Sequence, residues 1–193
     1  MSIDALLIST AAVAVAEIGD KTQLLSLVLA ARYRRPWPII GGILIATVLN
    51  HALAGAVGAA VAAWLSPDQL KWILALSFVA VAIWTLIPDK LDDADGATST
   101  GRSVLIATVI AFFIAEMGDK TQVATVLLAA QYPSLWQVVA GSTLGMLLAN
   151  APVVLLGAKF AHRLPLRAAR IVASAVFLLL AAWILLRLGL RTM

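Results

Sequence analysis

The sequence contains no cysteine and few charged residues. Of its 193 residues, 12% are Asp, Glu, Lys or Arg and 62% are hydrophobic, whereas a soluble domain carries about 25% charged residues. The absence of cysteine excludes disulfides, thiolate metal sites and cysteine nucleophiles. The shortage of charge indicates that water is not the main solvent of this chain.

The apolar residues form stretches of about 20 or more, the length that a helix needs to cross a hydrocarbon core of roughly 30 Å. They predict an all-α integral membrane protein with six transmembrane helices. The turn and loop segments between the apolar stretches set the boundaries of these helices. The predicted spans are Ile3–Ala31, Ile39–Trp64, Leu70–Ile87, Val104–Ala130, Val138–Ala161 and Ala168–Leu186.

An internal repeat organises these spans. A shift of 99 positions lays AEIGDKTQ (Ala16–Gln23) over AEMGDKTQ (Ala115–Gln122), and the register continues without a gap. Each unit holds three helices, at 1–88 and 103–193, joined by a cytoplasmic linker at 89–102. Because three is odd, the second unit enters the membrane from the opposite side, which predicts a 3+3 inverted repeat typical of transporters. Duplication that merely enlarged a bundle would not require the costliest residues to match best.

Basic residues are distributed unevenly between the predicted loops. Loops one, three and five hold Arg32, Arg34, Arg35, Lys90, Arg102, Lys159, Arg163, Arg167 and Arg170, and the opposite side holds Lys71, Arg187 and Arg191. The positive-inside rule then places loops one, three and five in the cytoplasm and both termini outside it. Membrane orientation and contact with lipid account for the net charge of +4, so nucleic acid is not an expected partner.

The repeated string places charged residues deep in the first and fourth spans. They are Glu17, Asp20 and Lys21 in the first unit, and Glu116, Asp119 and Lys120 in the second. Insertion scales give a free-energy cost of roughly 2.5 to 3.5 kcal/mol for placing one charged residue at the centre of a membrane helix. These six side chains must therefore face the protein interior and pair with each other, water or an ion.

Helical spacing predicts how the acidic side chains are arranged. In an unbroken helix, Glu17, Asp20 and Gln23 share one arc, and Glu116, Asp119 and Gln122 repeat it from the facing unit. Gly19 and Gly118 stand between each Glu and Asp, where glycine permits either a close helix approach or a local break. The predicted metal ligands are the oxygens of these six Glu, Asp and Gln residues, at the membrane midplane.

Oxygen ligands suit hard cations, of which Ca²⁺ and Mn²⁺ fit best, because Mg²⁺ dehydrates reluctantly. The metal is thus the transported ion, and no prosthetic group is expected. Four carboxylates and two lysines leave a net charge of −2 when all are ionised, which one divalent cation or two protons would neutralise. The count predicts exchange of a divalent cation for protons.

Further polar residues surround the predicted site. Lys21 and Lys120 are counter-charges for the carboxylates, or they change partners during transport. Asn50, His51 and Asn150 either support the site or make ordinary interhelical hydrogen bonds. Thr22 and Thr121 are expected, with Ser26 and Thr125, to point further from the Glu residues and to bond backbone groups.

The paired E-x-G-D-(K/R)-(T/S) strings resemble the Gdt family of Golgi, chloroplast and bacterial cation transporters. The motif falls on Glu17, Gly19, Asp20, Lys21 and Thr22, and on Glu116, Gly118, Asp119, Lys120 and Thr121. The resemblance implies Mn²⁺ and Ca²⁺ transport coupled to protons, with bacterial members tending to export Mn²⁺. The short chain is similar to a bacterial form, which implies the cytoplasmic membrane.

Two other classes of function compete with this interpretation. An acidic cage could also hold an amine, which would make the protein a channel or export carrier for small organic cations such as amino acids. An intramembrane enzyme could use paired carboxylates for acid and base chemistry. A symmetric duplication argues against the enzyme, because it supplies two equivalent acidic pairs rather than an acid and a base in different environments.

Overall fold

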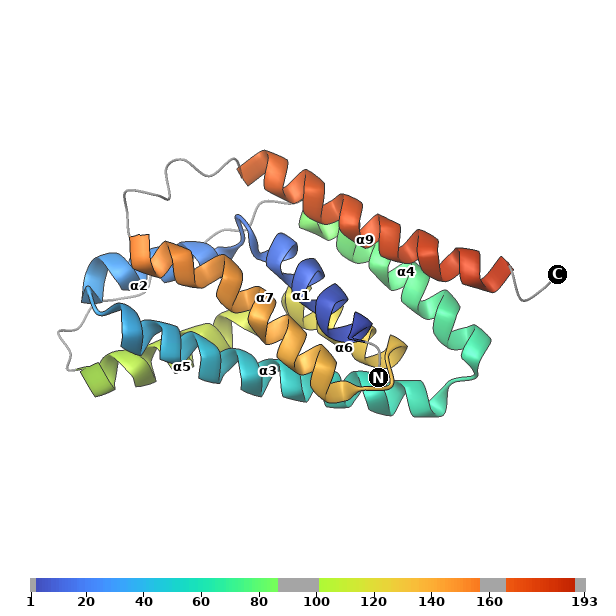
Figure 1. Cartoon of the computed structure of the whole chain (residues 1–193), viewed down its shortest axis with the longest axis horizontal. Coiled ribbons are helices and arrows are strands. Elements are labelled where there is room, and N and C mark those ends of the chain that lie inside the picture. Colours follow the sequence, from blue (N-terminus) through green and yellow to red (C-terminus); the bar gives the residue numbers. More distant parts are fainter. Residues whose placement is uncertain (1–2, 87–100, 157–165, 190–193) are drawn as a thin grey trace.

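The computed structural model describes residues 3–86, 101–156 and 166–189, and within these ranges the chain is helical and has no strand (Figure 1). The all-α class is therefore confirmed for the described residues. The predicted linker at 89–102 lies, except for its last two residues, outside them. The helices are α1 (Asp4–Glu17), α2 (Lys21–Tyr33), α3 (Pro36–Trp64), α4 (Pro67–Thr85), α5 (Gly101–Glu116), α6 (Lys120–Gln131), α7 (Leu135–Leu156) and α9 (Leu166–Gly189).

The first and fourth predicted spans are each broken into two helices. α1 ends at Glu17 and α2 begins at Lys21, while α5 and α6 meet at a bend of 72°. The backbone φ angle is 81° at Gly19 and 72° at Gly118, a region that glycine enters without the penalty that a Cβ imposes. The prediction that the acidic residues lie along one arc of an unbroken helix is therefore wrong. The alternative prediction, a local break at each glycine, is confirmed.

Two of the long helices, α3 and α7, carry no Asp, Glu, Lys or Arg. α3 has 29 residues and α7 has 22, and each is long and apolar enough to cross a membrane. The bent pair α5 and α6 would add a third crossing among the described residues. Six spans remain a prediction.

Equivalent residues of the two repeats meet in the core. Phe78 of α4 stacks on its register partner Phe177 of α9, with ring centroids 6.1 Å apart, and these two helices run side by side (Figure 1). A Cβ at Gly42 would lie 2.6 Å from Cβ of Thr108, and one at Gly141 would lie 3.0 Å from Cβ of Ser9. Gly42 and Gly141 are register partners, as are Thr108 and Ser9. Such reciprocal contacts are typical of two units related by a two-fold axis.

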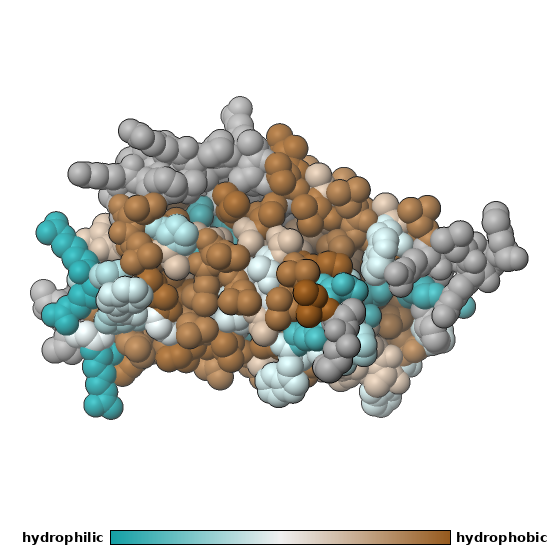
Figure 2. Space-filling view, in the orientation of Figure 1, coloured by the Kyte–Doolittle hydropathy of each residue, from teal (hydrophilic) through white to brown (hydrophobic). Residues whose placement is uncertain are grey.

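The outer surface of the bundle is largely apolar. Large hydrophobic side chains dominate the face that Figure 2 shows, and hydrophilic groups gather mainly near its ends. Leu148 on α7 and Leu53 on α3 are about 60% exposed, and the register partners Trp37 and Trp136 are exposed at the beginning of the same two helices. An apolar belt with aromatic residues near the helix ends is the surface that a lipid bilayer requires.

Candidate metal site

The four carboxylates of the repeated string lie inside the protein. Glu17 and Glu116 are fully buried, and Asp20 and Asp119 are at most 2% exposed. One carboxylate oxygen from each of Glu17, Asp20 and Asp119 lies within 4.8 Å of the others. The first repeat contributes two of these residues and the second contributes the third, so the structure brings acidic groups of both halves together.

The helix breaks position these carboxylates. Asp20 and Asp119 occupy the N-cap positions of α2 and α6 with extended backbones, yet neither side chain caps its own helix. Each carboxylate thus stays near the positive end of a helix dipole, which favours negative charge, while its oxygens remain available to other partners. A continuous helix would hold the same oxygens on its side, away from this terminus.

A glutamine stabilises each break in the same way. The Gly19 amide donates to Oε1 of Gln23 at 2.8 Å, and the Gly118 amide donates to Oε1 of Gln122 at 2.6 Å. Since these oxygens accept from their own glycines, the structure gives the glutamines a role that spacing did not predict. Their predicted role as metal ligands stays a prediction.

The other end of each glutamine reaches the opposite repeat. Nε2 of Gln122 donates to Oδ1 of Asn50 at 3.0 Å, and Nε2 of Gln23 donates to the carbonyl of Ala149 at 3.1 Å. Asn50 and Ala149 are register partners, so a backbone oxygen replaces the side-chain oxygen that alanine lacks.

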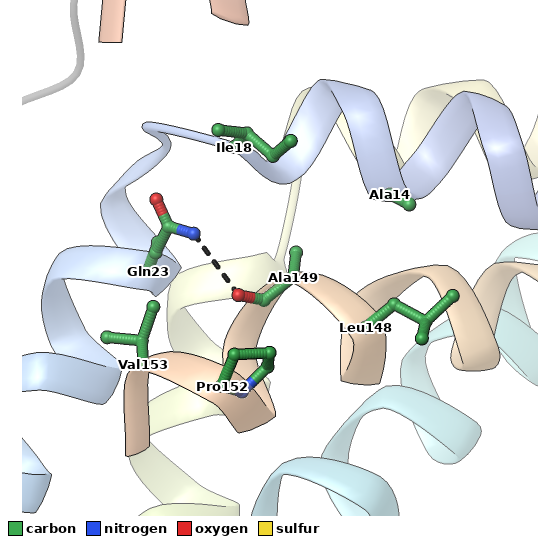
Figure 3. Close-up of a pocket in the computed structure, with 7 residues that line it drawn as sticks. All are labelled: Ala14, Ile18, Gln23, Leu148, Ala149, Pro152 and Val153. Atoms are coloured by element: carbon green, nitrogen blue, oxygen red, sulfur yellow. Dashed lines mark hydrogen bonds between the residues drawn. The ribbon is translucent and has the colours of Figure 1, made fainter. Parts of the chain in front are cut away.

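A cavity of about 330 Å³ lies beside this second contact. Figure 3 shows the hydrogen bond from Gln23 to the Ala149 carbonyl within it. The lining is mostly apolar, and it comes from α1 and the residue that follows it, from α2, and from the part of α7 around Pro152. The residues are Ala14, Ile18, Gln23, Leu148, Ala149, Pro152 and Val153.

The two lysines of the string make ion pairs across the repeat boundary. Nζ of Lys120 lies 2.8 Å from Oδ1 of Asp20, and Nζ of Lys21 lies 3.2 Å from Oδ1 of Asp119. The side chain of Lys120 is 3% exposed and that of Lys21 is 24% exposed. Each lysine is thus a counter-charge for the aspartate of the other half, and the pair around Lys21 is the more accessible of the two.

Asn150 is the predicted supporting residue that contacts an acidic group directly. Its Nδ2 lies 3.2 Å from Oε1 of Glu17, and its Oδ1 accepts from Oγ of Ser26 at 2.7 Å. Its register partner His51 instead places Nδ1 2.8 Å from Oγ of Ser142. Asn50 acts through Gln122 and donates its own Nδ2 to the carbonyl of Phe113.

The hydroxyl groups show where helical spacing failed. Oγ1 of Thr121 donates to Oε2 of Glu116 at 2.8 Å, and Ser26 holds Asn150, so the expectation that both point away from the site is wrong. The break between α5 and α6 removes the fixed 100° step that the expectation assumed. Thr125 bonds the backbone as expected, donating to the carbonyl of Thr121, and Thr22 is buried.

The resulting site combines negative charge with oxygens that can accept a cation. Oε2 of Glu17 and Oδ2 of Asp119 are buried and have no hydrogen-bond partner among the described residues. Buried carboxylate oxygens require compensation by a proton, a cation or a donor. Three carboxylates whose oxygens converge within 4.8 Å are therefore suited to exchange a bound cation for protons.

The sequence matches the family described as "Divalent cation/proton antiporter GDT1" over residues 5–93 and again over residues 104–190. The two matched ranges begin 99 positions apart, which is the offset of the internal repeat. No solved structure matches the chain.

Three relatives illustrate the similarity. A protein of Vibrio cholerae serotype O1, named "Putative manganese exporter", is 56% identical over 91% of this chain and 88% of its own length. "GDT1-like protein sll0615" of Synechocystis is 27% identical over 88% of this chain and 90% of its own. "GDT1-like protein 3" of Oryza sativa subsp. indica is 24% identical over 91% of this chain and 71% of its own.

Proposed function

The chain belongs to the GDT1 family of divalent cation/proton antiporters, and from that membership we propose that it exports a divalent cation in exchange for protons. Mn²⁺ is the first candidate, because a relative at 56% identity carries the name of a manganese exporter. Ca²⁺ is the second, because carboxylate and amide oxygens also suit that ion. The protein is a transporter and not an enzyme.

One observation carries the proposal, namely the convergence of buried carboxylates from both repeats. Glu17, Asp20 and Asp119 offer oxygens within 4.8 Å of one another, a separation that a single cation can bridge. Glu116 adds a fourth buried carboxylate, and the amide of Asn150 contacts Glu17. The metal would exchange its hydration shell for these oxygens.

Charge balance supports coupling to protons. The two ammonium groups are already paired with Asp20 and Asp119, so the four carboxylates leave a net charge of −2. A divalent cation cancels this charge, and so do two protons, but an uncompensated site is costly within a membrane. The site would therefore change its orientation with metal or with protons bound, and each species would displace the other.

The lysines have a defined place in this cycle. Each one holds an aspartate of the candidate ligand set in the structure described here, so an arriving cation competes with an ammonium group for the same oxygen. The ammonium would give way to the metal and return when the metal leaves. This role keeps the aspartates compensated between transport events.

We place the site in a six-span bundle built as a 3+3 inverted repeat, in the cytoplasmic membrane of a bacterium, with both termini outside the cytoplasm. The repeat contacts in the core support the two-fold relation, and the distribution of basic residues supports the orientation. In this arrangement the cation would leave the cytoplasm while protons enter.

Flux in proteoliposomes tests the proposal. We expect Mn²⁺ to move across the membrane in one direction and protons in the other. A fluorescent indicator entrapped in the liposomes reports Mn²⁺, and the internal pH is recorded at the same time. Asp20→Asn should abolish both signals. Asp68→Asn is the matched control, because Asp68 is 82% exposed and pairs with Lys71 away from the site. Flux of amino acids without metal flux would instead favour a carrier for organic cations.

A further inference from the structure

A sulfur atom lies close to the acidic site. Met146 on α7 is fully buried, and its Sδ lies 3.1 Å from Nδ2 of Asn150. The same nitrogen lies 3.2 Å from Oε1 of Glu17. A single amide group thus separates the thioether from a candidate metal ligand.

The repeat register shows that this sulfur belongs to one half alone. The partner of Met146 is Thr47 on α3, which is also fully buried. Oγ1 of Thr47 has no hydrogen-bond partner in the part of the chain that the structure describes. Equivalent positions in the two halves therefore present a thioether and a hydroxyl, although the acidic string itself is repeated almost unchanged.

We propose that Met146 is a specificity-determining residue whose thioether favours Mn²⁺ over Ca²⁺ at the site formed around Glu17. The inference rests on the proposed function and names a selectivity element of that same site. Thioethers are soft, polarisable donors. Mn²⁺ prefers oxygen ligands, as Ca²⁺ does, but as a transition metal it accepts a soft donor more readily than Ca²⁺, which takes oxygen ligands almost exclusively. The sulfur would therefore add affinity for Mn²⁺ and none for Ca²⁺.

The hydrogen bonds suggest how the sulfur meets the ion. The Asn150 amide donates to Glu17 and contacts Met146 through one nitrogen, Nδ2. A cation on Glu17 can bind the unpartnered Oε2, and the Asn150 amide can keep its bond to Oε1, because metal-bound carboxylates commonly accept hydrogen bonds. The thioether meets the ion only if the Asn150 amide, which contacts both Met146 and Glu17, rotates away from the sulfur.

A structural role for the methionine makes a different prediction. Met146 also packs in a hydrophobic cluster with Val13, Ile43 and Phe112, and methionine commonly fills irregular gaps in a core. If packing were its whole role, a substitution of similar volume would alter the binding of all metals alike. Selectivity among metals therefore separates the two roles, whereas loss of activity alone does not.

The test measures binding of three metals by purified full-length protein in detergent at one fixed pH, using calorimetry. Ca²⁺ is the hard probe, Mn²⁺ the intermediate one and Cd²⁺ the soft one of similar size to Ca²⁺. In Met146→Leu we expect Cd²⁺ affinity to fall by about tenfold or more, Mn²⁺ affinity by roughly threefold, and Ca²⁺ affinity to stay within about twofold. Met117→Leu is the matched control, because it removes an exposed sulfur and should change none of the three.

Two further arms keep the test decisive. Met146→Gln replaces sulfur with an amide oxygen and should shift preference towards Ca²⁺. Selenomethionine labelling preserves the fold and should raise the Cd²⁺ affinity of the wild type above that of unlabelled wild type. The same labelling should not raise the Cd²⁺ affinity of Met146→Leu. If that variant does not fold, the comparison of labelled with unlabelled wild type still gives the test. Equal losses for all three metals, or no change in Cd²⁺ affinity, would overturn the inference. Absence of divalent cation binding in the wild type would instead refute the proposed function.

Discussion

The two helix breaks share one construction. In each, a glutamate ends one helix, a glycine with positive φ turns the chain, and an aspartate begins the next helix. A glutamine four residues after the glycine accepts a hydrogen bond from the glycine amide. The lysine directly after the aspartate pairs with the aspartate of the other half. Because duplication preserved these parts together, they form the machinery that both halves need.

The breaks differ in what surrounds them. Glu17 contacts Asn150, whereas Glu116 accepts from its own neighbour Thr121. Gly19 is buried and Gly118 is exposed, and Lys21, which pairs with Asp119 beside Gly118, is more accessible than Lys120. The repeated string thus makes the same break twice, whereas the side chains packed around each break differ in kind and in exposure.

The largest expected effect comes from breaking the shared part. Asp20→Asn or Asp119→Asn should each reduce Mn²⁺/H⁺ exchange by about 100-fold or more, because each removes one of three converging carboxylates. Initial rates in proteoliposomes measure the effect. Unequal losses, with one variant retaining near-normal exchange, would mean that the halves do not share one site.

Asp20→Asn also leaves Lys120 buried without its charge partner, so a folding defect must be separated from a transport defect. The double variant Asp20→Asn/Lys120→Met removes the charge together with its partner. We expect it to regain thermal stability in detergent but not exchange. Recovery of exchange in the double variant would contradict a ligand role for Asp20.

The second comparison concerns the two lysines. Lys120→Met should destabilise the protein by about 3 to 5 kcal/mol, because it removes the ammonium group that pairs with the buried carboxylate of Asp20. Lys21→Met should cost less, since its side chain is 24% exposed. Lys71→Met should cost about 0 to 1 kcal/mol, because its partner Asp68 is 82% exposed and stays solvated without the lysine. Thermal unfolding in detergent ranks the three. Mn²⁺ should restore most stability to the Lys120 variant. A reversed ranking would contradict the inference that the Lys120–Asp20 pair is the less accessible of the two.

The third comparison concerns backbone conformation. A Cβ at Gly118 would meet no atom within 4 Å, so Gly118→Ala tests the positive φ without a steric clash. We expect a loss of about 1 to 2 kcal/mol, and a smaller loss for Gly118→Asn because Asn tolerates this region better. Melting temperatures of the two variants provide the measurement. If both matched the wild type, the break would be able to revert to ordinary helix.

The smallest effects concern the residues that differ between halves. Asn150→Ala removes the amide that joins Glu17 to Ser26, and we expect Mn²⁺ affinity to fall by roughly three- to tenfold. His51→Asn should change that affinity by less than about twofold, because His51 is bonded to Ser142 and not to a carboxylate. Calorimetric titration compares them. A larger effect at His51 would place it in the site.

The sequence predicted much of this architecture because its strongest signals are energetic. Apolar length predicted the helices, and the cost of Glu17 or Glu116 in lipid predicted their burial. Spacing could not predict the partners made after the break, such as Thr121 with Glu116, because the helical step no longer applies there. Met146 carried no signal, since nothing in a run of apolar residues distinguishes a sulfur beside a carboxylate from one in a core.

The central claim is that acidic groups of both halves hold a single ion. The most direct measurement is the binding stoichiometry of Mn²⁺ on purified protein by calorimetry, for the wild type, Asp20→Asn and Asp119→Asn. A shared site predicts one ion per chain in the wild type and none in either variant. Two ions per chain, with each variant retaining one, would contradict the account.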